Sequence, residues 1–347
     1  MKLAIESCDD DRIVFIVEDT DLALINAVRR VVLAEVPYVA VALDGWNFRE
    51  NTCVLHNHFL GHRITMTPLH LSRTEADAYI PGSIKVSLKV AHSSTARAPL
   101  DVTSKDLAVT LHDQPHPDTA RLYPADPLTG DHVLLTVLKP GEAVSAEAAA
   151  VRGVAGTHAC FAVASQCAFE PLLDAALVKA ARPASDDPAV QNRFQCIDRL
   201  RCWTAGPDGN PRAFRFTVAS ECGMTALDIV SSALDVLESK CVTSVATVAA
   251  SGDHGLTTLE VAGEGHTLGN FLQSVAMDEL VGDAPKPLAF AGYHCPHPLE
   301  KRVLFTLRTT ERTDALEAFS AMKAAGAERV RELRHLLREE AARGELA

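Results

Sequence analysis

The sequence lacks an excess of basic residues: its 347 residues include 33 Lys and Arg against 45 Asp and Glu, a formal net charge of −12. A protein that holds a nucleic-acid backbone by displacing counterions needs the opposite balance, so we expect contact with DNA or RNA to be indirect or local. The longest apolar run, residues 31–43, contains Glu35 and Pro37 and is too short to cross a bilayer. The acidic N-terminal segment lacks the long apolar region of a secretory signal, so we expect a soluble, intracellular protein.

Standard catalytic signatures are also missing. The nine cysteines contain no CxxC pair, and their odd number favours free thiols in a reducing compartment. There is no phosphate-binding GxxxxGK[ST] loop, no dinucleotide GxGxxG motif and no esterase GxSxG motif. No carboxylate triplet suggests a two-metal polymerase site. The sequence therefore gives little support to a catalytic role.

The sequence does contain an internal repeat. At about 150 residues per domain the chain should hold about two domains, and 47% hydrophobic with 22% charged residues is typical of a globular protein. A predicted strand, residues 13–17, precedes a helix that ends at Pro37, and a second predicted strand, residues 256–261, precedes a helix over about residues 268–280. We expect Thr267 to cap this second helix.

The two predicted helices carry equivalent stripes in the same register, Asn26, Arg29, Arg30 and Leu33 on the first and Asn270, Gln273, Ser274 and Met277 on the second. Each copy continues with a strand and a long amphipathic helix, at residues 212–219 and 225–240 and again at residues 302–309 and about 313–343. A linker is expected around residues 240–255. Strand-like stretches at residues 83–90, 108–112 and 133–138 interrupt the first copy and predict an inserted β-rich domain. The chain is thus expected to form a pseudo-dimer.

Two groups of residues allow alternative interpretations. The motif HNHFLGH places His56, His58 and His62 close together, with the last two on one helix face, and such a cluster can bind a metal. Exposed or core-satisfied histidines are the commoner outcome. A nucleophilic Cys/His pair is disfavoured in the same way, because nine thiols and 14 histidines make chance pairings easy. Arg29 and Arg30 are either part of a solvated face or anchors for the carboxylates of a partner.

The run DTDLALINAVRRVVLAEVP, followed by NTCVLHNHFLGHRITMTPL, resembles the α-like subunits of multisubunit RNA polymerases, specifically the third-largest subunit of eukaryotic RNA polymerase II and its archaeal D-type counterpart. The similarity continues at LKPGEAVSAEAAAVRGVAGTHA and FRFTVASECGMTALDIVSSALDVLESK. The blocks EVAGEGHTLGNFLQ and AGYHCPHPLEKRVLFTLRTT resemble the small α-like partner, which is the eleventh eukaryotic subunit or its archaeal L-type counterpart. The chain therefore resembles a fusion of two subunits, as found in polymerases of large DNA viruses.

This resemblance implies an α+β fold with two α-subunit-type dimerisation modules that form an intramolecular pseudo-heterodimer. The predicted parts are a first module at residues 1–47 and 170–245, an insert domain at residues 48–169 and a second module at residues 246–347. The implied function is a non-catalytic assembly scaffold of a DNA-directed RNA polymerase. Its implied partners are the two largest subunits and small zinc-bearing adaptors, with nucleic acid contacted only through the complex, in the host nucleus or cytoplasm or in a virion.

The interface residues that the resemblance implies lie in four groups: Asn26, Arg29 and Arg30; His62 and Arg63; Gly153, His158 and Ala159; and His266, Thr267, Leu268, Gly269 and Asn270 with His297 and Pro298. Many third-subunit homologues carry a cysteine-rich metal motif in the insert, but residues 71–97 contain no such cluster, so we expect no metal or other cofactor. The chain also departs from the family pattern at Asn57, His58, Cys160, Phe161, Ala162 and Gln273. Two alternatives remain: a metal- or thiol-dependent enzyme, and a regulator that binds polymerase subunits.

Overall fold

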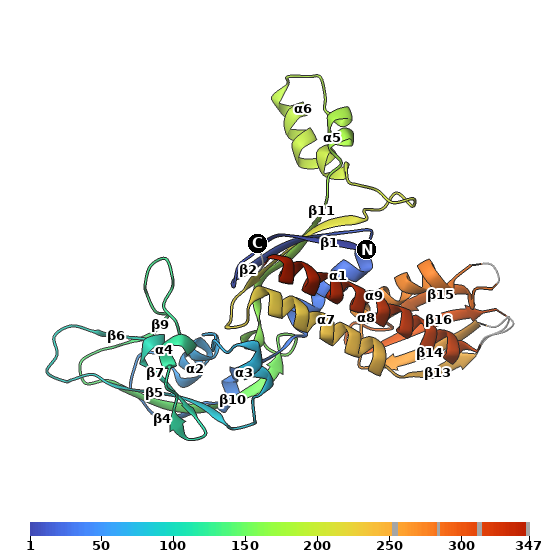
Figure 1. The fold of residues 1–347 in the computed structure, drawn as a ribbon. Coiled ribbons are helices and arrows are strands. Elements are labelled where there is room, and N and C mark those ends of the chain that lie inside the picture. Colours follow the sequence, from blue (N-terminus) through green and yellow to red (C-terminus); the bar gives the residue numbers. More distant parts are fainter. Residues whose placement is uncertain (252–255, 283–284, 311–313, 345–347) are drawn as a thin grey trace.

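The computed structural model describes residues 1–251, 256–282, 285–310 and 314–344. A central sheet and a group of long helices carry three projections: the insert at the left of Figure 1, the second module at the right and a narrow arm at the top. No helix in these described ranges is both long and apolar enough to cross a membrane.

The first module is a four-stranded antiparallel sheet covered by helices. Its strands follow the order β1 (Lys2–Cys8), β2 (Arg12–Glu18), β12 (Ala213–Ser220) and β11 (Ala164–Pro171). On β2 the side chains of Ile13, Phe15 and Val17 alternate toward the core and are at most 2% exposed. This face packs against α1 (Leu22–Ala34) and α7 (Ala226–Thr243), which begin at the N-caps Asp21 and Thr225.

The second module repeats this arrangement. Its strands follow the order β13 (Ala246–Ser251), β14 (Leu256–Ala262), β16 (Arg302–Thr309) and β15 (Leu288–His294). Its helices are α8 (His266–Val275), which continues as a π-helical turn η7 (Ala276–Leu280), and α9 (Ala315–Gly344). Each sheet therefore combines two strands before its short helix with two after it, and the predicted α+β pseudo-dimer is confirmed.

The insert is a β-rich domain with short helices. Its larger sheet has the order β3 (Pro37–Val41), β10 (Ala143–Val154), β5 (Ile84–Ala91), β7 (Leu107–Leu111) and β8 (Gln114–Pro115), with β4 (Asn47–Asn51) also paired to β10. A second sheet joins β6 (Leu100–Thr103) to β9 (Leu134–Leu138). The helices are α2 (Asn57–Thr65), α3 (Arg73–Asp77) and α4 (Thr119–Leu122).

Strand pairing crosses the module limits expected at residues 47 and 169. β3 was assigned to the first module, but it pairs with β10 of the insert. β11 starts within the expected insert, at Ala164, but it pairs with β12 of the first sheet. Pairing partners are not visible in the periodicity of a single strand. We propose that the insert begins with β3 and ends before β11.

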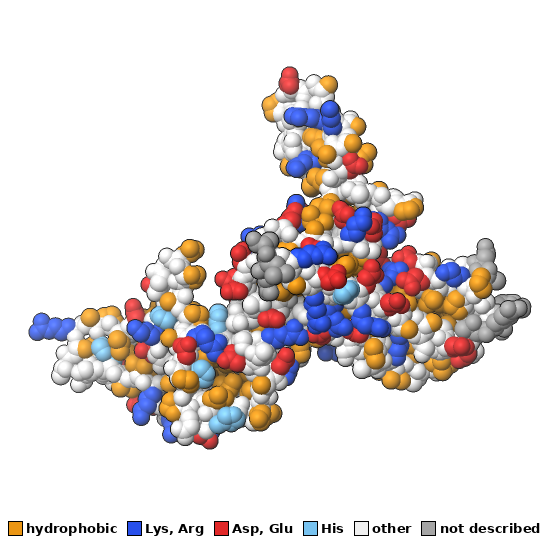
Figure 2. Space-filling view, in the orientation of Figure 1, with side chains coloured by type: hydrophobic (Ala, Val, Ile, Leu, Met, Phe, Trp, Pro, Cys, Tyr) orange, Lys and Arg blue, Asp and Glu red, His pale blue; other side chains and the backbone are white. Residues whose placement is uncertain are grey.

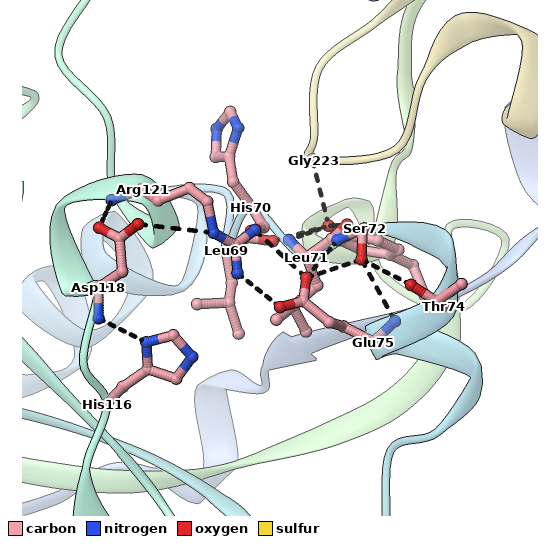
Figure 3. A network of polar contacts seen from close by, with 11 residues as sticks. Leu69, His70, Leu71, Ser72, Thr74, Glu75, His116, Asp118, Arg121 and Gly223 are labelled. Carbon is pink, nitrogen blue, oxygen red and sulfur yellow. Dashed lines mark hydrogen bonds and ion pairs between the residues drawn. The ribbon is translucent and has the colours of Figure 1, made fainter.

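The insert is fastened to the first module by a polar junction around the buried Tyr38 hydroxyl. Figure 3 shows Leu69, Leu71 and Gly223, which contribute to this junction. The hydroxyl lies 2.8 Å from the carbonyl oxygen of Leu69 and 2.9 Å from that of Leu71, and it accepts the backbone N–H of Leu71 at 2.8 Å. Gly223, just before α7, has its N–H 3.4 Å from the same oxygen. A Cβ at Gly223 would lie 2.6 Å from the backbone of His70, so the two chain segments meet backbone to backbone. The junction therefore fixes the position of the insert.

The two long helices build one core across the modules. α7 and α9 pack side by side, and α9 extends beyond its own module to pack on β1 (Figure 1). Leu333 and Leu337 of α9, at most 2% exposed, line one small cavity with Phe15 and Phe216 of the first sheet. The second module thus contributes side chains to the core of the first, as in an obligate dimer.

Two expectations at the second module were wrong in detail. Gly265, not Thr267, is the N-cap of α8, because the helix already includes His266. The expected helix over residues 268–280 changes to a π turn after Val275. The connection between the modules lies within the expected range of residues 240–255 but is short: α7 continues to Thr243 with Cys241 fully buried, and β13 begins at Ala246. Residues 252–255 of the expected linker lie outside the described residues.

Candidate functional site

The two modules meet where α1 crosses α8. Arg30 Nε, near the end of α1, donates to Thr267 Oγ1 at the start of α8 over 2.7 Å. Ser274 Oγ, near the end of α8, donates to Asp21 Oδ2 before α1 over 2.8 Å. A side chain of each helix therefore forms a hydrogen bond with a residue at the beginning of the other helix. Asp21 Oδ1 also accepts the N–H of Leu24 at 2.8 Å, so one carboxylate caps α1 and joins the modules.

A hollow of about 250 Å³ lies between these two helices. Its lining residues are Ala23, Asn26, Ala27, Arg30, His266, Thr267, Asn270 and Tyr293. Five of them were predicted from the sequence, although the two sets are far apart in the chain. Arg30, His266 and Asn270 are exposed and offer guanidinium, imidazole and amide groups to a polar partner. This arrangement is suited to recognition of a carboxylate or amide.

The other predicted residues of this interface are structural. Arg29 does not line the hollow, and it donates to Asn26 Oδ1 through Nη2 at 2.9 Å. Burial raises the pKa of the Cys167 thiol to about 12, although the positive charge of Arg29 acts in the opposite direction. Leu268 is fully buried, and Gly269 leaves no room for a side chain because a Cβ there would lie 2.5 Å from the Tyr293 ring.

An ion-pair triad links the modules on the α7 side. Lys240 Nζ lies 2.5 Å from Glu35 Oε2 after α1 and 2.7 Å from Glu264 Oε2 before α8. The three side chains are between 16% and 25% exposed. Burial lowers the pKa of Lys240, but its hydrogen bonds to the two carboxylates outweigh this effect and the net pKa is raised. Lys240 therefore remains protonated at neutral pH.

A matching triad, which Asp278 extends by a further ion pair to Arg329 at 3.3 Å, lies on the α9 side. Arg329 Nε lies 2.7 Å from Glu279 Oε1 at the end of the η7 turn, and Arg329 Nη1 lies 3.1 Å from Asp21 Oδ2 before α1. Glu279 follows Asn270 by the same number of residues as Glu35 follows Asn26. Lys240 of the first module thus joins the end of α1 to the start of α8, and Arg329 of the second module joins the end of the α8–η7 helix to the start of α1. These cations were not predicted from the sequence, because their partners are distant in the chain.

Ion pairs also connect the long helices to the insert. Asp235 on α7 forms two ion pairs. Its Oδ1 lies 2.5 Å from Arg334 Nη1 of α9, and its Oδ2 lies 2.7 Å from Arg73 Nη2 of α3. Glu238, one turn further along α7, forms an ion pair with Arg334 Nη2, which lies 2.7 Å from its Oε2. The carboxylates of α7 therefore hold the second module and the insert to the same helix.

The predicted insert residues form a second, separate group. The rings of His62 and His158 meet edge to face, with centroids 6.3 Å apart. Arg63 Nη2 donates to the carbonyl oxygen of Leu134 at 2.6 Å, at the start of β9. Ala159 follows His158, whose Nδ1 accepts the N–H of Cys160 at 3.2 Å at the start of the turn η3 (Ala159–Phe161).

Gly153 accounts for the shape of the loop that follows β10. A Cβ at this position would lie 2.6 Å from the Phe161 ring, so only glycine allows the ring to pack here. The loop is anchored to α1 by the Gly156 N–H, which donates to the carbonyl oxygen of Ala34 at 2.8 Å.

The third predicted location is a surface turn. His297 and Pro298 are exposed between β15 and β16, and His297 Nδ1 accepts the N–H of Leu299 at 3.2 Å. Neither residue lines the hollow between α1 and α8. Tyr293 and Gln273, which the sequence did not single out for the interface, connect β15 to α8: Gln273 Oε1 accepts the Tyr293 N–H at 3.1 Å.

The histidine motif does not converge on one point. His56 is the N-cap of α2 and accepts the His58 N–H through Nδ1 at 3.2 Å, whereas His62 faces His158. Within the described ranges no group of three His, Cys, Asp or Glu side chains is arranged to hold a metal ion. Burial raises the pKa of Cys160 to about 11 and that of Cys241 to about 12, the reverse of what a nucleophilic thiol requires.

Both modules match one known family. Residues 14–241 and residues 257–338 each match the RNA polymerase Rpb3/Rpb11 dimerisation domain. The chain belongs to this family. The α1–α8 crossing is therefore the contact between two Rpb3/Rpb11-type modules within one polypeptide.

Individual relatives agree with this assignment. The chain is 30% identical over 174 residues to the DNA-directed RNA polymerase subunit Rpo3 of Methanobrevibacter smithii, covering 49% of the chain and 58% of the relative. It is 30% identical over 183 residues to the DNA-directed RNA polymerase II subunit RPB3 of Schizosaccharomyces pombe, covering 48% and 59%. With the Rpo3 of Pyrococcus horikoshii the identity is 38% over 109 residues, covering 31% and 40%. The chain thus spans between two fifths and three fifths of each of these relatives.

Proposed function

We propose that the protein is a non-catalytic assembly subunit of a DNA-directed RNA polymerase. The observation that carries this proposal is the packing of two Rpb3/Rpb11-type modules against each other through α1 and α8. The relatives named above are polymerase subunits, which supports the same role here. The chemistry of the α1–α8 hollow suits binding rather than catalysis, because its polar groups belong to a protein–protein contact.

The finer part of the proposal is that the chain fuses a third-subunit-like half to an eleventh-subunit-like half. The direct passage from α7 to β13 supports it, because so short a connection keeps the halves at a very high effective concentration. Fusion of this kind, and with it a viral polymerase, was expected from the resemblance and remains a proposal.

We propose three contact surfaces for the partners. The α1–α8 hollow, with Asn26, Arg30 and His266, is the surface for one of the two largest subunits. The insert group of His62, Arg63, Gly153, His158 and Ala159 is the surface for the other large subunit and for small zinc-bearing adaptors. The turn at His297 and Pro298 is a further contact. The exposure of Arg30, His62 and His297 supports their availability to partners.

The test is reconstitution with the two largest subunits of the same source. A tagged full-length chain is co-expressed with them, and the material recovered at near-physiological salt is identified by mass and assayed for transcription. We expect both large subunits in stoichiometric amounts. The variant Arg30→Ala should lower their recovery by about tenfold, as expected for loss of a central arginine in an interface.

The matched control is Arg97→Ala, which removes an exposed arginine between β5 and β6. It should recover both large subunits as the wild type does. The wild-type chain emerging alone, without either large subunit, would contradict the assembly role. Equal recovery with Arg30→Ala would instead contradict only the assignment of the hollow as a docking surface.

A further inference from the structure

The arm, defined here as residues 172–211, leaves the first sheet between β11 and β12 and projects away from the rest of the molecule (Figure 1). It consists of α5 (Ala175–Ala181), α6 (Pro188–Arg193), a π turn η4 (Phe194–Asp198) and a 3₁₀ turn η5 (Arg199–Arg201). An isolated bridge between Leu173 and Trp203 closes its base. The sequence pattern did not predict the arm as a separate unit.

The arm has almost no core of its own. Every one of its residues is described by the structure, and only Phe194 and Cys202 among them are buried. The large apolar side chains on its surface are Leu177 at 47% exposed, Val190 at 37%, Ile197 at 46% and Leu200 at 55%. Helices of one or two turns are unstable alone in water, and a unit of this size needs more apolar burial than one Phe and one Cys provide. A covering surface would supply that burial.

The charges of the arm show what kind of surface fits. Two of its five Asp side chains cap its own helices: Asp174 accepts the Ala176 N–H at 2.7 Å as N-cap of α5, and Asp187 accepts the Ala189 N–H at 2.9 Å as N-cap of α6. Asp198 lies 3.8 Å from Arg193. Four cations form no ion pair within the described part of the chain: Lys179, Arg182, Arg199 and Arg201. Figure 2 shows blue side chains beside orange ones on the arm.

We propose that the arm docks into an apolar groove rimmed by Asp and Glu side chains on another protein chain. Leu177, Ile197 and Leu200 supply the apolar contact, and the unpaired cations meet the rim. A nucleic acid fits less well. The arm contains as many Asp as Lys and Arg together, and its Phe194 ring is buried rather than free to stack on bases.

The experiment uses the intact complex purified through a tag on the full-length chain. A carbodiimide joins an ammonium group to a carboxylate that touches it, so we expect mass spectrometry to find Lys179 linked to an Asp or Glu of another chain. Hydrogen exchange of the amides in residues 175–201 should be at least about tenfold slower in the complex than in the isolated chain. The double variant Leu177→Asp and Leu200→Asp should abolish both signals.

A control double variant, Leu128→Asp and Ile80→Asp, places the same charges on apolar side chains that are 94% and 60% exposed elsewhere. It should keep both signals. The proposal is wrong if the amides of the arm exchange equally fast in the complex, or if protection disappears after nuclease treatment, which would identify nucleic acid as the partner. It does not depend on the polymerase assignment: absence of the large catalytic subunits with a persisting Lys179 cross-link would overturn that assignment alone.

Discussion

A single glycine permits a close contact inside the second module, beside the hollow between α1 and α8. At Gly269 the α8 backbone lies against the Tyr293 ring of β15, and the ring in turn packs near Phe305 with centroids 6.4 Å apart. The Tyr293 ring also meets the His266 ring edge to face at 5.8 Å. Glycine is therefore required at position 269 for steric reasons. It lets β15 and α8 approach closely enough to form one side of the hollow.

We predict that Gly269→Ala lowers the free energy of unfolding by about 1–3 kcal/mol, because the ring must move to admit a methyl group 2.5 Å away. Urea denaturation of the full chain measures this change. Gly45→Ala is the control, since its Cβ would find its nearest neighbour at 3.7 Å, and it should stay close to wild type. Equal stability of the two variants would show that the Tyr293 ring is free to rearrange.

A second residue-scale prediction concerns His70, at the junction of the insert and the first module (Figure 3). Burial lowers its pKa, the carboxylates of Glu221 and Asp11 raise it, and the guanidinium of Arg121 lowers it, with a net decrease from 6.5. The unfolded chain therefore takes up a proton first as the pH falls. Stability contributed by neutral His70 is present above about pH 6.5 and is lost as the pH falls through the lower native pKa.

The variant His70→Gln, which has no titrating ring, should lose less stability than the wild type between about pH 7 and pH 5. Urea denaturation across that range gives the two slopes. His58→Gln is a suitable control because that ring is exposed on α2 and should leave the slope unchanged. A His70→Gln slope as steep as that of the wild type would place the acid sensitivity elsewhere.

At the scale of elements, the two triads show how a duplicated module is locked to its copy. Lys240 and Arg329 sit on the long helices, and each joins the end of one short helix to the beginning of the other. Removing one partner from a largely buried ion pair leaves the other charges without compensation. Loss of either cation should therefore destabilise the contact between the two short helices.

We predict that Lys240→Met lowers the free energy of unfolding by about 1–3 kcal/mol, less than for a fully buried pair because the three side chains retain some exposure. The conservative variant Lys240→Arg should recover most of the loss by keeping the positive charge. Chemical denaturation compares the three proteins. If Lys240→Met were as stable as the wild type, the triad would contribute no net stability, as holds for many ion pairs at a surface.

The repeated elements could be predicted well from the sequence, since their apolar periodicity is strong. β2, α1, β12, α7, β14 and β16 all lie where the pattern placed them, within a few residues. The pattern missed β1, in which only Leu3 is buried, because an exposed strand has no alternation to detect. The arm was missed for the same reason: its helices bury almost nothing.

The candidate site was predicted only in part. Asn26 and Asn270 were matched by register, and the structure brings both to one hollow. Lys240, Arg329 and Tyr293 carry no local signal, since each acquires its role from partners in other elements. The Thr267 hydroxyl was misjudged as a cap because nothing in its neighbouring sequence shows that Arg30 reaches it from the other module.

At the scale of the whole molecule, the two modules should remain together without the covalent connection. We predict that a protease site inserted after Val245, which is 73% exposed, can be cut without separating the halves. Size-exclusion chromatography at micromolar concentration should show both fragments in one peak. We expect the fragments to stay together because Leu333 and Leu337 of the second module pack inside the core of the first.

The same cut in a chain carrying Leu333→Asp and Leu337→Asp should release two peaks, because buried carboxylates would penalise the shared core. Co-elution of these fragments would assign the cohesion to the α1–α8 crossing and the triads. Separation of the fragments without any substitution would mean that the backbone connection itself holds the modules together.

The insert and the arm both belong to the first module, while the sheets and short helices of the two modules repeat each other. A body with two matching halves looks nearly alike after a half-turn, so a partner that recognised only the crossed helices would bind in either of two orientations. The two attachments remove that ambiguity. They make the two faces of the molecule different, so the assembly role proposed above would give each added component a single orientation.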